Sequence, residues 1–229
     1  MTRVAILWDM DGTLLDSEPA HAAALHDATE ELGLTVPDGF HDLLLGASDD
    51  RVHAALAAST GLDLTLSEWR AVKWGHYKRH AASIPLRHEV AAVALEFFLQ
   101  GLPMAVVSNS TADEVALCLG AAGLSKLFIA TVSRADVRRG KPDPEGYLLA
   151  ARKLNVAPGC CIVVEDSPVG AQAGVAAGMR TFYLPQQPLA GQLVPQGAQY
   201  VAADYSRIVQ SAVQQLRLSV TETVPGHGV

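Results

Sequence analysis

Two aspartates, Asp9 and Asp11, directly follow the apolar run Val4-Ala5-Ile6-Leu7-Trp8, and the chain then breaks at Gly12-Thr13. The apolar run predicts a buried strand, and the carboxyl end of such a strand is where open α/β sheets hold ligands. Two carboxylates this close repel each other unless a divalent cation or a shared proton offsets their charge. The sequence therefore predicts a magnesium-dependent site at the edge of a sheet.

The pattern of the chain changes twice after this strand. Residues 17–84 are helical in pattern, with amphipathic segments at Ala20–Leu32, Asp49–Ser59 and Ser67–Ala81. Beyond Pro85, strand and helix signals alternate, which is typical of an α/β fold with a parallel sheet. The predicted strands are Pro103–Val107, Leu127–Val132, Cys161–Val164 and Thr181–Leu184, and the predicted helices are Glu89–Gln100, Ala112–Ala122, Glu145–Asn155 and Val169–Ala177.

This alternation divides the chain into two domains. We expect residues 1–16 and 85–229 to form an α/β core domain with helices on both faces of its sheet. Residues 17–84 would form a helical cap inserted above the carboxyl edge of the sheet, where it is placed to act as a lid. The tail Ser219–Val229 has little apolar surface to bury, and we expect it to be mobile.

Three further loops carry polar residues to the same edge. After Val106-Val107, the chain continues with Ser108-Asn109-Ser110, and Thr111 with Glu114 forms a capping-box pattern that marks a helix start. Ser108 and the neighbouring backbone N–H groups would face an anion at that helix N-terminus. An ordinary turn is the alternative explanation for this loop.

The next loop is Lys141-Pro142-Asp143-Pro144. Asp143 fits an N-cap and Pro144 the first helical position, which places the cation of Lys141 beside the positive end of a helix dipole. A solvated lysine is the alternative, but the expected pocket already holds acids that need a partner.

The last loop, Glu165-Asp166-Ser167-Pro168, ends the strand Ile162-Val163-Val164, with Ser167 as helix cap. Paired acids in an apolar core are costly unless they bind a metal. Magnesium prefers oxygen ligands, and Asp9, the backbone carbonyl of Asp11 and Asp166 would supply them, with Glu165 binding directly or through water. The alternative is a plain cap with surface charge.

Composition limits the class of protein. The net charge of −7 argues against a general nucleic-acid surface, and no run approaches the roughly 20 apolar residues of a membrane span. The first strand begins at residue 4, which leaves no room for a cleavable signal, so we expect a cytoplasmic protein. Cys118, Cys160 and Cys161 have neither disulfide nor metal-ligand spacing and are interpreted as small apolar residues.

Asp9-x-Asp11-Gly12-Thr13, Ser108-Asn109, Lys141-Pro142-Asp143 and Glu165-Asp166 resemble, in order and spacing, the four motifs of the haloacid dehalogenase (HAD) superfamily. The stretch from Val163 to Met179 is similar to the subgroup of β-phosphoglucomutase-like and 6-phosphogluconate phosphatase-like enzymes. The resemblance implies a Rossmann-like core with a helical cap. It further implies a phosphatase of small phosphorylated metabolites such as sugar or sugar-acid phosphates, with Mg²⁺ as cofactor.

The resemblance also implies roles for individual residues. Asp9 would be the nucleophile that forms an aspartyl-phosphate, and Asp11 the general acid and base. Ser108 would hold a phosphate oxygen, and Lys141 would bridge Asp9 and the phosphoryl group. The implied metal ligands are Asp9, Asp11, Glu165 and Asp166, and the implied substrate-binding residues are Gly12, Thr13, His21, Ser108, Asn109 and Lys141.

Two readings stay open beside this one. A β-phosphoglucomutase-type mutase is the nearest alternative, because His21 matches a cap-helix histidine of that enzyme. The mutase carries an arginine three residues after its loop glycine, whereas here Leu45–Ser48 is followed by Asp49, an acid that would repel a second phosphate; Arg51 is the alternative substitute for that arginine. A binding protein without turnover is the other. We expect a monomer or weak homo-oligomer.

Substrate choice would lie in the cap. The candidates are His21, the loop Gly46–Arg51 and the basic helix residues Arg70, Lys73, His76, Lys78, Arg79 and His80, for which a solvated helix face is the alternative. Relatives usually carry Pro-Gly where this chain has Arg87-His88, and the sequence offers no physical reason for that difference.

Overall fold

The computed structural model describes residues 4–44, 49–186, 194–201 and 205–222. These residues form two compact units, one made of residues 1–15 and 86–229 and the other of residues 16–85. The sequence placed the cap at residues 17–84, whereas the second unit runs from Asp16 to Pro85. That this unit acts as a lid stays a prediction.

The larger unit is built on a six-stranded sheet in which every pairing is parallel, with the strand order β3-β2-β1-β4-β5-β6. This arrangement confirms the predicted α/β class. The strands are β1 (Ala5–Trp8), β2 (Met104–Val107), β3 (Ala130–Val132), β4 (Cys161–Glu165), β5 (Arg180–Tyr183) and β6 (Gln199–Tyr200). The helices of this unit are α5 (His88–Leu99), α6 (Ala112–Ala121), α7 (Glu145–Leu154), α8 (Pro168–Ala176) and α9 (Tyr205–Glu222).

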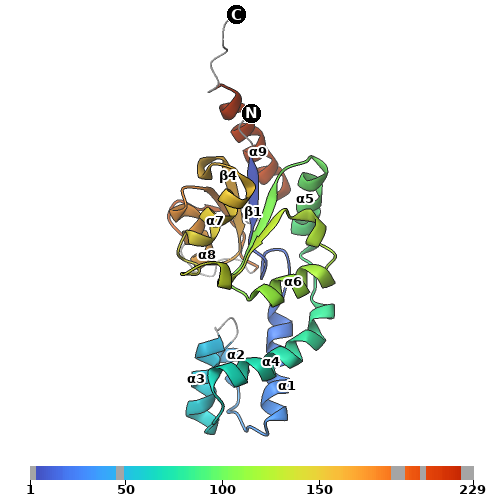
Figure 1. Ribbon diagram of the computed structural model, residues 1–229, viewed down its shortest axis with the longest axis vertical. Coiled ribbons are helices and arrows are strands. Elements are labelled where there is room, and N and C mark those ends of the chain that lie inside the picture. The colour runs from blue at the N-terminus through green and yellow to red at the C-terminus, as the bar shows by residue number, and fades with distance from the viewer. Residues whose placement is uncertain (1–3, 45–48, 187–193, 202–204, 223–229) are drawn as a thin grey trace, which may run out of the picture. The chain divides into compact units, whose positions relative to one another are not determined.

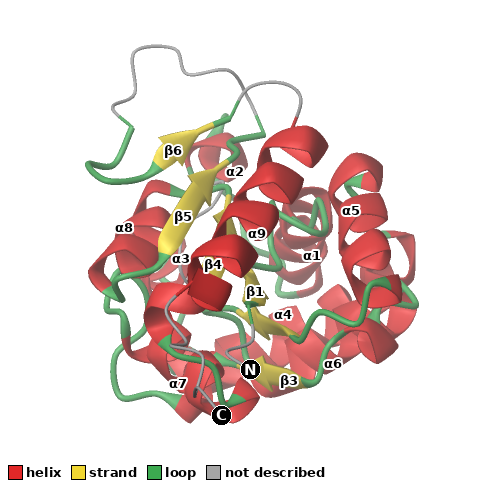
Figure 2. Ribbon diagram, turned by 90° about the horizontal axis from the view of Figure 1, so that it is seen from above, coloured by secondary structure: helices red, strands yellow, loops and turns green. Residues whose placement is uncertain are grey.

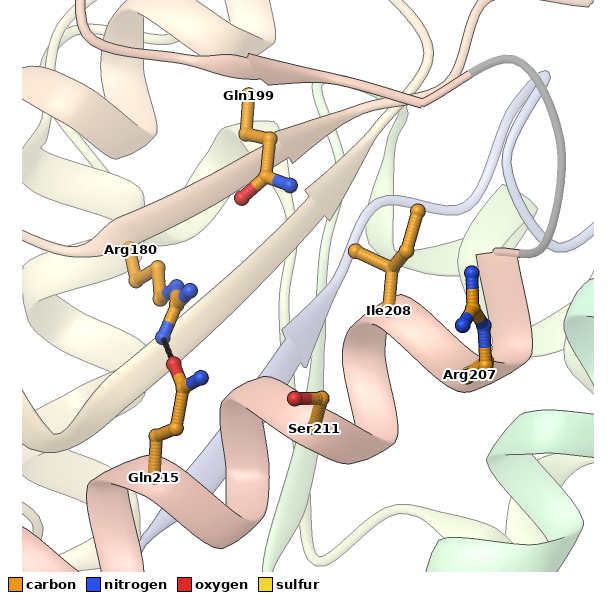
Figure 3. Close-up of a pocket in the computed structure, with 6 residues that line it drawn as sticks. All are labelled: Arg180, Gln199, Arg207, Ile208, Ser211 and Gln215. Atoms are coloured by element: carbon orange, nitrogen blue, oxygen red, sulfur yellow. Dashed lines mark hydrogen bonds between the residues drawn. The ribbon is translucent and has the colours of Figure 1, made fainter.

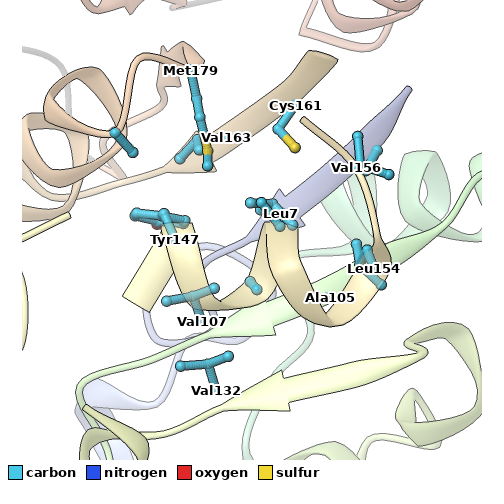
Figure 4. Close-up of a cluster of buried hydrophobic side chains, with 14 of the residues drawn as sticks. Leu7, Ala105, Val107, Val132, Tyr147, Leu154, Val156, Cys161, Val163 and Met179 are labelled. Atoms are coloured by element: carbon cyan, nitrogen blue, oxygen red, sulfur yellow. The ribbon is translucent and has the colours of Figure 1, made fainter. Parts of the chain in front are cut away.

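Helices cover both faces of the sheet, and Figure 2 shows α5 and α9 on the side opposite α7 and α8. On the α7 side, Leu7, Val107 and Val163 point from three neighbouring strands into one apolar cluster with Tyr147 and Leu154 of α7 (Figure 4). Every residue of these three strands, β1, β2 and β4, is buried, so the apolar runs read from the sequence are core strands covered on both faces.

Local capping fixes where two of these helices begin. Thr111 Oγ1 accepts a hydrogen bond from the Glu114 N–H at 3.3 Å, and the side chain of Glu114 accepts one from the Thr111 N–H at 3.4 Å. Ser167 Oγ accepts from the Gly170 N–H at 3.1 Å, with Pro168 as the first residue of α8. Both predicted caps are confirmed, so the loops after β2 and β4 each end on a helix N-terminus.

Four sequence expectations are wrong in detail. The expected mobile tail is helical as far as Glu222, because α9 buries Val209, Ala212 and Val213 at helical spacing; residues 223–229 lie outside the described part. The sequence reading also missed β6 and the four-residue helix α2 (Phe40–Leu43), which are too short to show a period. Strand β3 begins three residues later than expected, since Ser125–Leu127 forms a 3-10 turn.

The smaller unit is entirely helical in its described residues (Figure 1). It contains α1 (Glu18–Glu31), α2, α3 (Asp49–Thr60) and α4 (Leu66–His80), followed by a 3-10 turn at Ala81–Ser83. Helices α1 and α4 pack on each other around a core of their own. Its buried members are Leu25, Ala28, Phe40, Val52, Leu56 and Trp69.

An open cavity of about 280 Å³ lies between α9 and the β5–β6 edge, where Arg180 Nη1 donates to Gln215 Oε1 at 2.9 Å (Figure 3). Among the described residues, no helix is long and apolar enough to cross a membrane. Cys118 and Cys161 are buried and Cys160 is half-buried, and none of the three forms a disulfide.

Candidate active site

The site begins with three adjacent strands, β2, β1 and β4, whose carboxyl ends lie side by side. Trp8, the last residue of β1, is in register with Val106 of β2 and with Val164 of β4. The next residues along each strand are therefore neighbours at one edge. This register brings together Asp9, Ser108 and the Glu165-Asp166 pair, as the sequence predicted for strand ends of a parallel sheet.

Lys141 carries the positive charge of this edge. Its Nζ donates to Asp9 Oδ1 at 2.5 Å and to Glu165 Oε1 at 2.6 Å, and its side chain is 6% exposed. Burial by itself would lower the pKa of this ammonium group, but the two carboxylates raise the pKa above its usual value. Lys141 is therefore a fixed cation, and the solvated-lysine alternative is wrong.

Glu165 is the most enclosed carboxylate, with no exposed surface. Its Oε1 accepts from Lys141 Nζ and, at 2.7 Å, from the hydroxyl of Tyr147. Its Oε2 accepts from the N–H of Ser167 at 3.3 Å and from Ser167 Oγ at 3.0 Å. Each oxygen thus already accepts two hydrogen bonds, which anchors the carboxylate beneath the first turn of α8.

Two glycines make room for the acids. A Cβ at Gly170 would lie 1.7 Å from Glu165 Oε1, and one at Gly12 would lie 2.0 Å from Asp166 Oδ2. Gly12 also has a φ of +79°, a conformation that L side chains rarely adopt. Only glycine at these positions lets the helix and the turn approach the carboxylates so closely.

Asp11 is directed to a different loop. Its Oδ2 accepts hydrogen bonds from Ser108 Oγ and from Ser110 Oγ, each at 3.0 Å. Ser108 Oγ in turn accepts from the Ser110 N–H at 2.9 Å. The two serines hold the Asp11 carboxyl group at the end of β2. Asp9, two residues earlier in the chain, is bound by Lys141 instead.

Three carboxylates form a candidate metal centre: Asp9, Glu165 and Asp166 each offer one oxygen, and these atoms lie within 4.8 Å of one another. Asp9 Oδ2 is buried without a hydrogen-bond partner among the described residues. Burial, then the charge of Glu165, raises the pKa of Asp9 and raises that of Asp166 to about 7. A buried carboxylate oxygen without a hydrogen-bond partner, among acids whose pKa values are raised by burial and mutual repulsion, fits a site for a divalent cation.

The remaining predicted residues lie as follows. Thr13 is buried, with its Oγ1 3.5 Å from Asp166 Oδ1. Asn109 binds the backbone of Lys141: its Oδ1 accepts from the Lys141 N–H at 3.0 Å. His21 belongs to the smaller unit, where its ring stacks on Tyr77 at 4.4 Å. Residues 45–48, which include most of the predicted specificity loop, lie outside the described part.

The basic run of α4 is largely balanced within its own unit. Lys73 Nζ donates to Asp49 Oδ1 at 2.7 Å, and His80 Nε2 lies 2.8 Å from Asp27 Oδ2. His76 is buried, with Nε2 2.8 Å from Glu31 Oε2. These pairings connect α4 to α1 and α3, so a solvated face does not describe the whole run.

The sequence reading was wrong at one cap and missed three contacts. Helix α7 begins at Glu145 with Pro144 as its N-cap, one residue later than the predicted cap at Asp143, although Asp143 Oδ1 still accepts from the Glu145 N–H at 3.0 Å. Ser110, Ser167 and Tyr147 were not predicted to touch the acids. Tyr147 is the third residue of α7, and nothing in its local pattern distinguishes it from a core aromatic residue.

Comparison with known proteins places the chain in a family. The model of haloacid dehalogenase-like hydrolases matches residues 4–178. The Phosphorylated carbohydrates phosphatase of Thermotoga maritima is 30% identical over 180 residues, covering 78% of this chain and 83% of the relative. The 6-phosphogluconate phosphatase of Escherichia coli is 32% identical over 195 residues, covering 82% and 86%.

The crystal structure of CbbY from Rhodobacter sphaeroides in complex with phosphate superposes with a TM-score of 0.77 at 25% identity, covering 88% of this chain and 94% of that one. The chain belongs to the haloacid dehalogenase-like hydrolases, and the resemblance drawn from its motifs is confirmed.

The close approach at Gly170 predicts a stability defect. In Gly170→Ala the new methyl group would displace Glu165 from its four hydrogen bonds, so we expect a loss of more than about 2 kcal/mol in the free energy of unfolding, together with loss of activity. Gly120→Ala in α6 is the matched control, because nothing lies within 4 Å of its added Cβ. Urea unfolding of both variants measures the difference, and equal stabilities would contradict it.

The raised carboxyl pKa predicts a pH dependence for the protein freed of metal. Asp166, with a pKa of about 7, keeps a proton that the unfolded chain releases near its ordinary value of 3.8. The folded state then binds more protons, so the free energy of unfolding should fall as the pH rises from about 4 to 7. Thermal unfolding in EDTA at pH 5 and pH 8 tests this; MgCl₂ should restore stability at pH 8, and Asp166→Asn should flatten the slope.

Proposed function

We propose that this hydrolase is a Mg²⁺-dependent phosphatase of small phosphorylated sugars or sugar acids that works through an aspartyl-phosphate on Asp9. The observation that carries the proposal is the orphaned Asp9 Oδ2 within the cluster of Asp9, Glu165 and Asp166. The names of the curated relatives support the substrate class, since they describe phosphatases of phosphorylated carbohydrates and of 6-phosphogluconate.

Asp9 is suited to the role of nucleophile. Lys141 holds its Oδ1, which fixes the carboxylate, while Oδ2 has no partner in the described part of the chain. In the first step, an oxygen of Asp9 forms a bond to phosphorus and the ester oxygen leaves; in the second, water takes the phosphoryl group and Asp9 is restored. Splitting the reaction in this way replaces one difficult step with two easier ones.

Asp11 is suited to move the protons. Ser108 and Ser110 orient its carboxyl group at the end of β2, within two residues of the nucleophile. In the first step Asp11 gives its proton to the leaving ester oxygen, and in the second it accepts a proton from the attacking water. The same carboxyl group thus ends the cycle in the protonation state in which it began.

Charge compensation comes from Lys141 and the metal. Lys141 is a buried cation in contact with Asp9, where it can bind an equatorial phosphoryl oxygen. A magnesium ion held by Asp9, Asp166 and the Asp11 carbonyl, with Glu165 behind them, would neutralise charge on the phosphoryl oxygens. Because Glu165 already accepts four hydrogen bonds, its proposed part is to position Lys141.

The nucleophile role predicts that Asp9→Asn lowers phosphate release more than about a thousandfold, since the amide cannot form the acyl-phosphate. The measurement is Mg²⁺-dependent phosphate release across sugar, sugar-acid and nucleotide monophosphates. Substantial activity in the variant would overturn the mechanism. Consumption of β-glucose 1-phosphate by the wild type without phosphate release would identify a mutase instead.

The acid role of Asp11 predicts a dependence on the leaving group. Asp11→Asn should slow the hydrolysis of alkyl phosphates far more than that of activated aryl phosphates, because a good leaving group departs without a proton. Rates for 4-nitrophenyl phosphate and for a hexose phosphate give the comparison. Equal losses with both substrates would argue against proton donation by this residue.

A further inference from the structure

Arg87 joins three segments of the larger unit. It is half-buried and precedes α5, where its backbone N–H donates to the Leu14 carbonyl at 3.0 Å. Its Nη1 donates to the carbonyl of Gly12 at 2.6 Å and to that of Leu184 at 3.2 Å. One side chain therefore links the turn after Asp11 to the segment that follows β5.

Both linked segments lead to the carboxylates. Gly12 directly follows Asp11, and Asp166 lies against its Cα, where an added Cβ would be 2.0 Å from Oδ2. The Leu184 N–H donates to the carbonyl of Glu165 at 2.6 Å, next to Asp166. Arg87 thus bridges the turn on one side of the candidate metal centre and the backbone that supports the other side.

A guanidinium group is well suited to this bridge. The Nη1 of Arg87 carries two N–H groups, so one end of the planar side chain donates to both carbonyl oxygens in a fixed geometry. Arg87 also lies close enough to Asp166 to lower the pKa of that carboxyl group. Its positive charge alone would disfavour a bound cation, so a positioning effect and a charge effect on metal affinity have opposite signs.

We propose, building on the function above, that Arg87 is a positioning residue that tethers the Asp11-Gly12 turn to the end of β5 and so holds the metal-binding oxygens in place. The Arg87-His88 pair, which the sequence left unexplained, then has a role for its first member. Outer partners of metal ligands commonly change metal affinity about 10- to 100-fold when removed.

The test is Mn²⁺ binding, followed by electron paramagnetic resonance in the absence of substrate. Arg87→Met removes both donors, and we expect the dissociation constant to rise about 10-fold or more. Arg87→Lys keeps the charge but replaces the planar guanidinium with an ammonium group on a shorter side chain, and it should fall between Arg87→Met and the wild type. Arg180→Met, at the opposite end of β5 and bonded to Gln215, is the matched control and should bind Mn²⁺ as the wild type does.

Unchanged or tighter Mn²⁺ binding in Arg87→Met would overturn the proposal, tighter binding being the signature of a pure charge effect. If Arg87→Met does not fold, Arg87→Lys decides: weaker Mn²⁺ binding than in the wild type supports the proposal, and unchanged binding overturns it. In activity assays, the Mg²⁺ concentration for half-maximal rate should rise in parallel, while kcat at saturating Mg²⁺ changes less.

The readout separates this proposal from the proposed function. Binding of Mn²⁺ needs no turnover, so the expected order of affinities without phosphate release from any ester would refute only the phosphatase. Magnesium-dependent phosphate release with unchanged Mn²⁺ binding in Arg87→Met would refute only the role of Arg87.

Discussion

The contact of Lys141 with Asp9 and Glu165 is the interaction on which the site depends. Three carboxylates are gathered at one edge of a buried sheet, and the buried ammonium group of Lys141 offsets part of their charge. Without Lys141, the free-energy cost of desolvating these acids would not be offset by an ion pair, and the folded state would be destabilised. The raised pKa values of Asp9 and Asp166 show that one cation does not balance the cluster, which leaves room for a second.

The architecture makes this concentration of charge possible. Adjacent parallel strands deliver Asp9, Ser108 and Glu165 to one edge, and helices capped at Thr111 and Ser167 begin where the strands end. The rest of the chain supports the edge from behind: Tyr147 binds Glu165 from α7, and Arg87 secures the turn after Asp11. The helix caps, the strand ends and the close glycine contacts together fix the positions of the site residues, so the geometry of the site depends on the whole larger unit.

The smaller unit has its own electrostatic balance. Its buried histidine and its lysine pair with acids of neighbouring helices, so much of the basic run on α4 contributes to packing α4 against α1 and α3. His21 likewise stacks on Tyr77 within that unit. Because of these pairings, fewer basic side chains of α4 are available to bind an anionic substrate. The proposed catalytic residues all belong to the larger unit.

Local signals such as apolar runs, capping boxes and turn residues were enough to predict the fold class, the order of the central strands along the chain and two helix caps. They also predicted the acids, the serine and the lysine at the strand ends. Contacts between residues far apart in the sequence could be seen only in the tertiary structure. It turned Asp11 toward Ser110, packed α9 on the core and brought Tyr147 and Arg87 to groups far away in sequence. Such contacts have no local pattern, since they arise only when the sheet order sets which loops become neighbours.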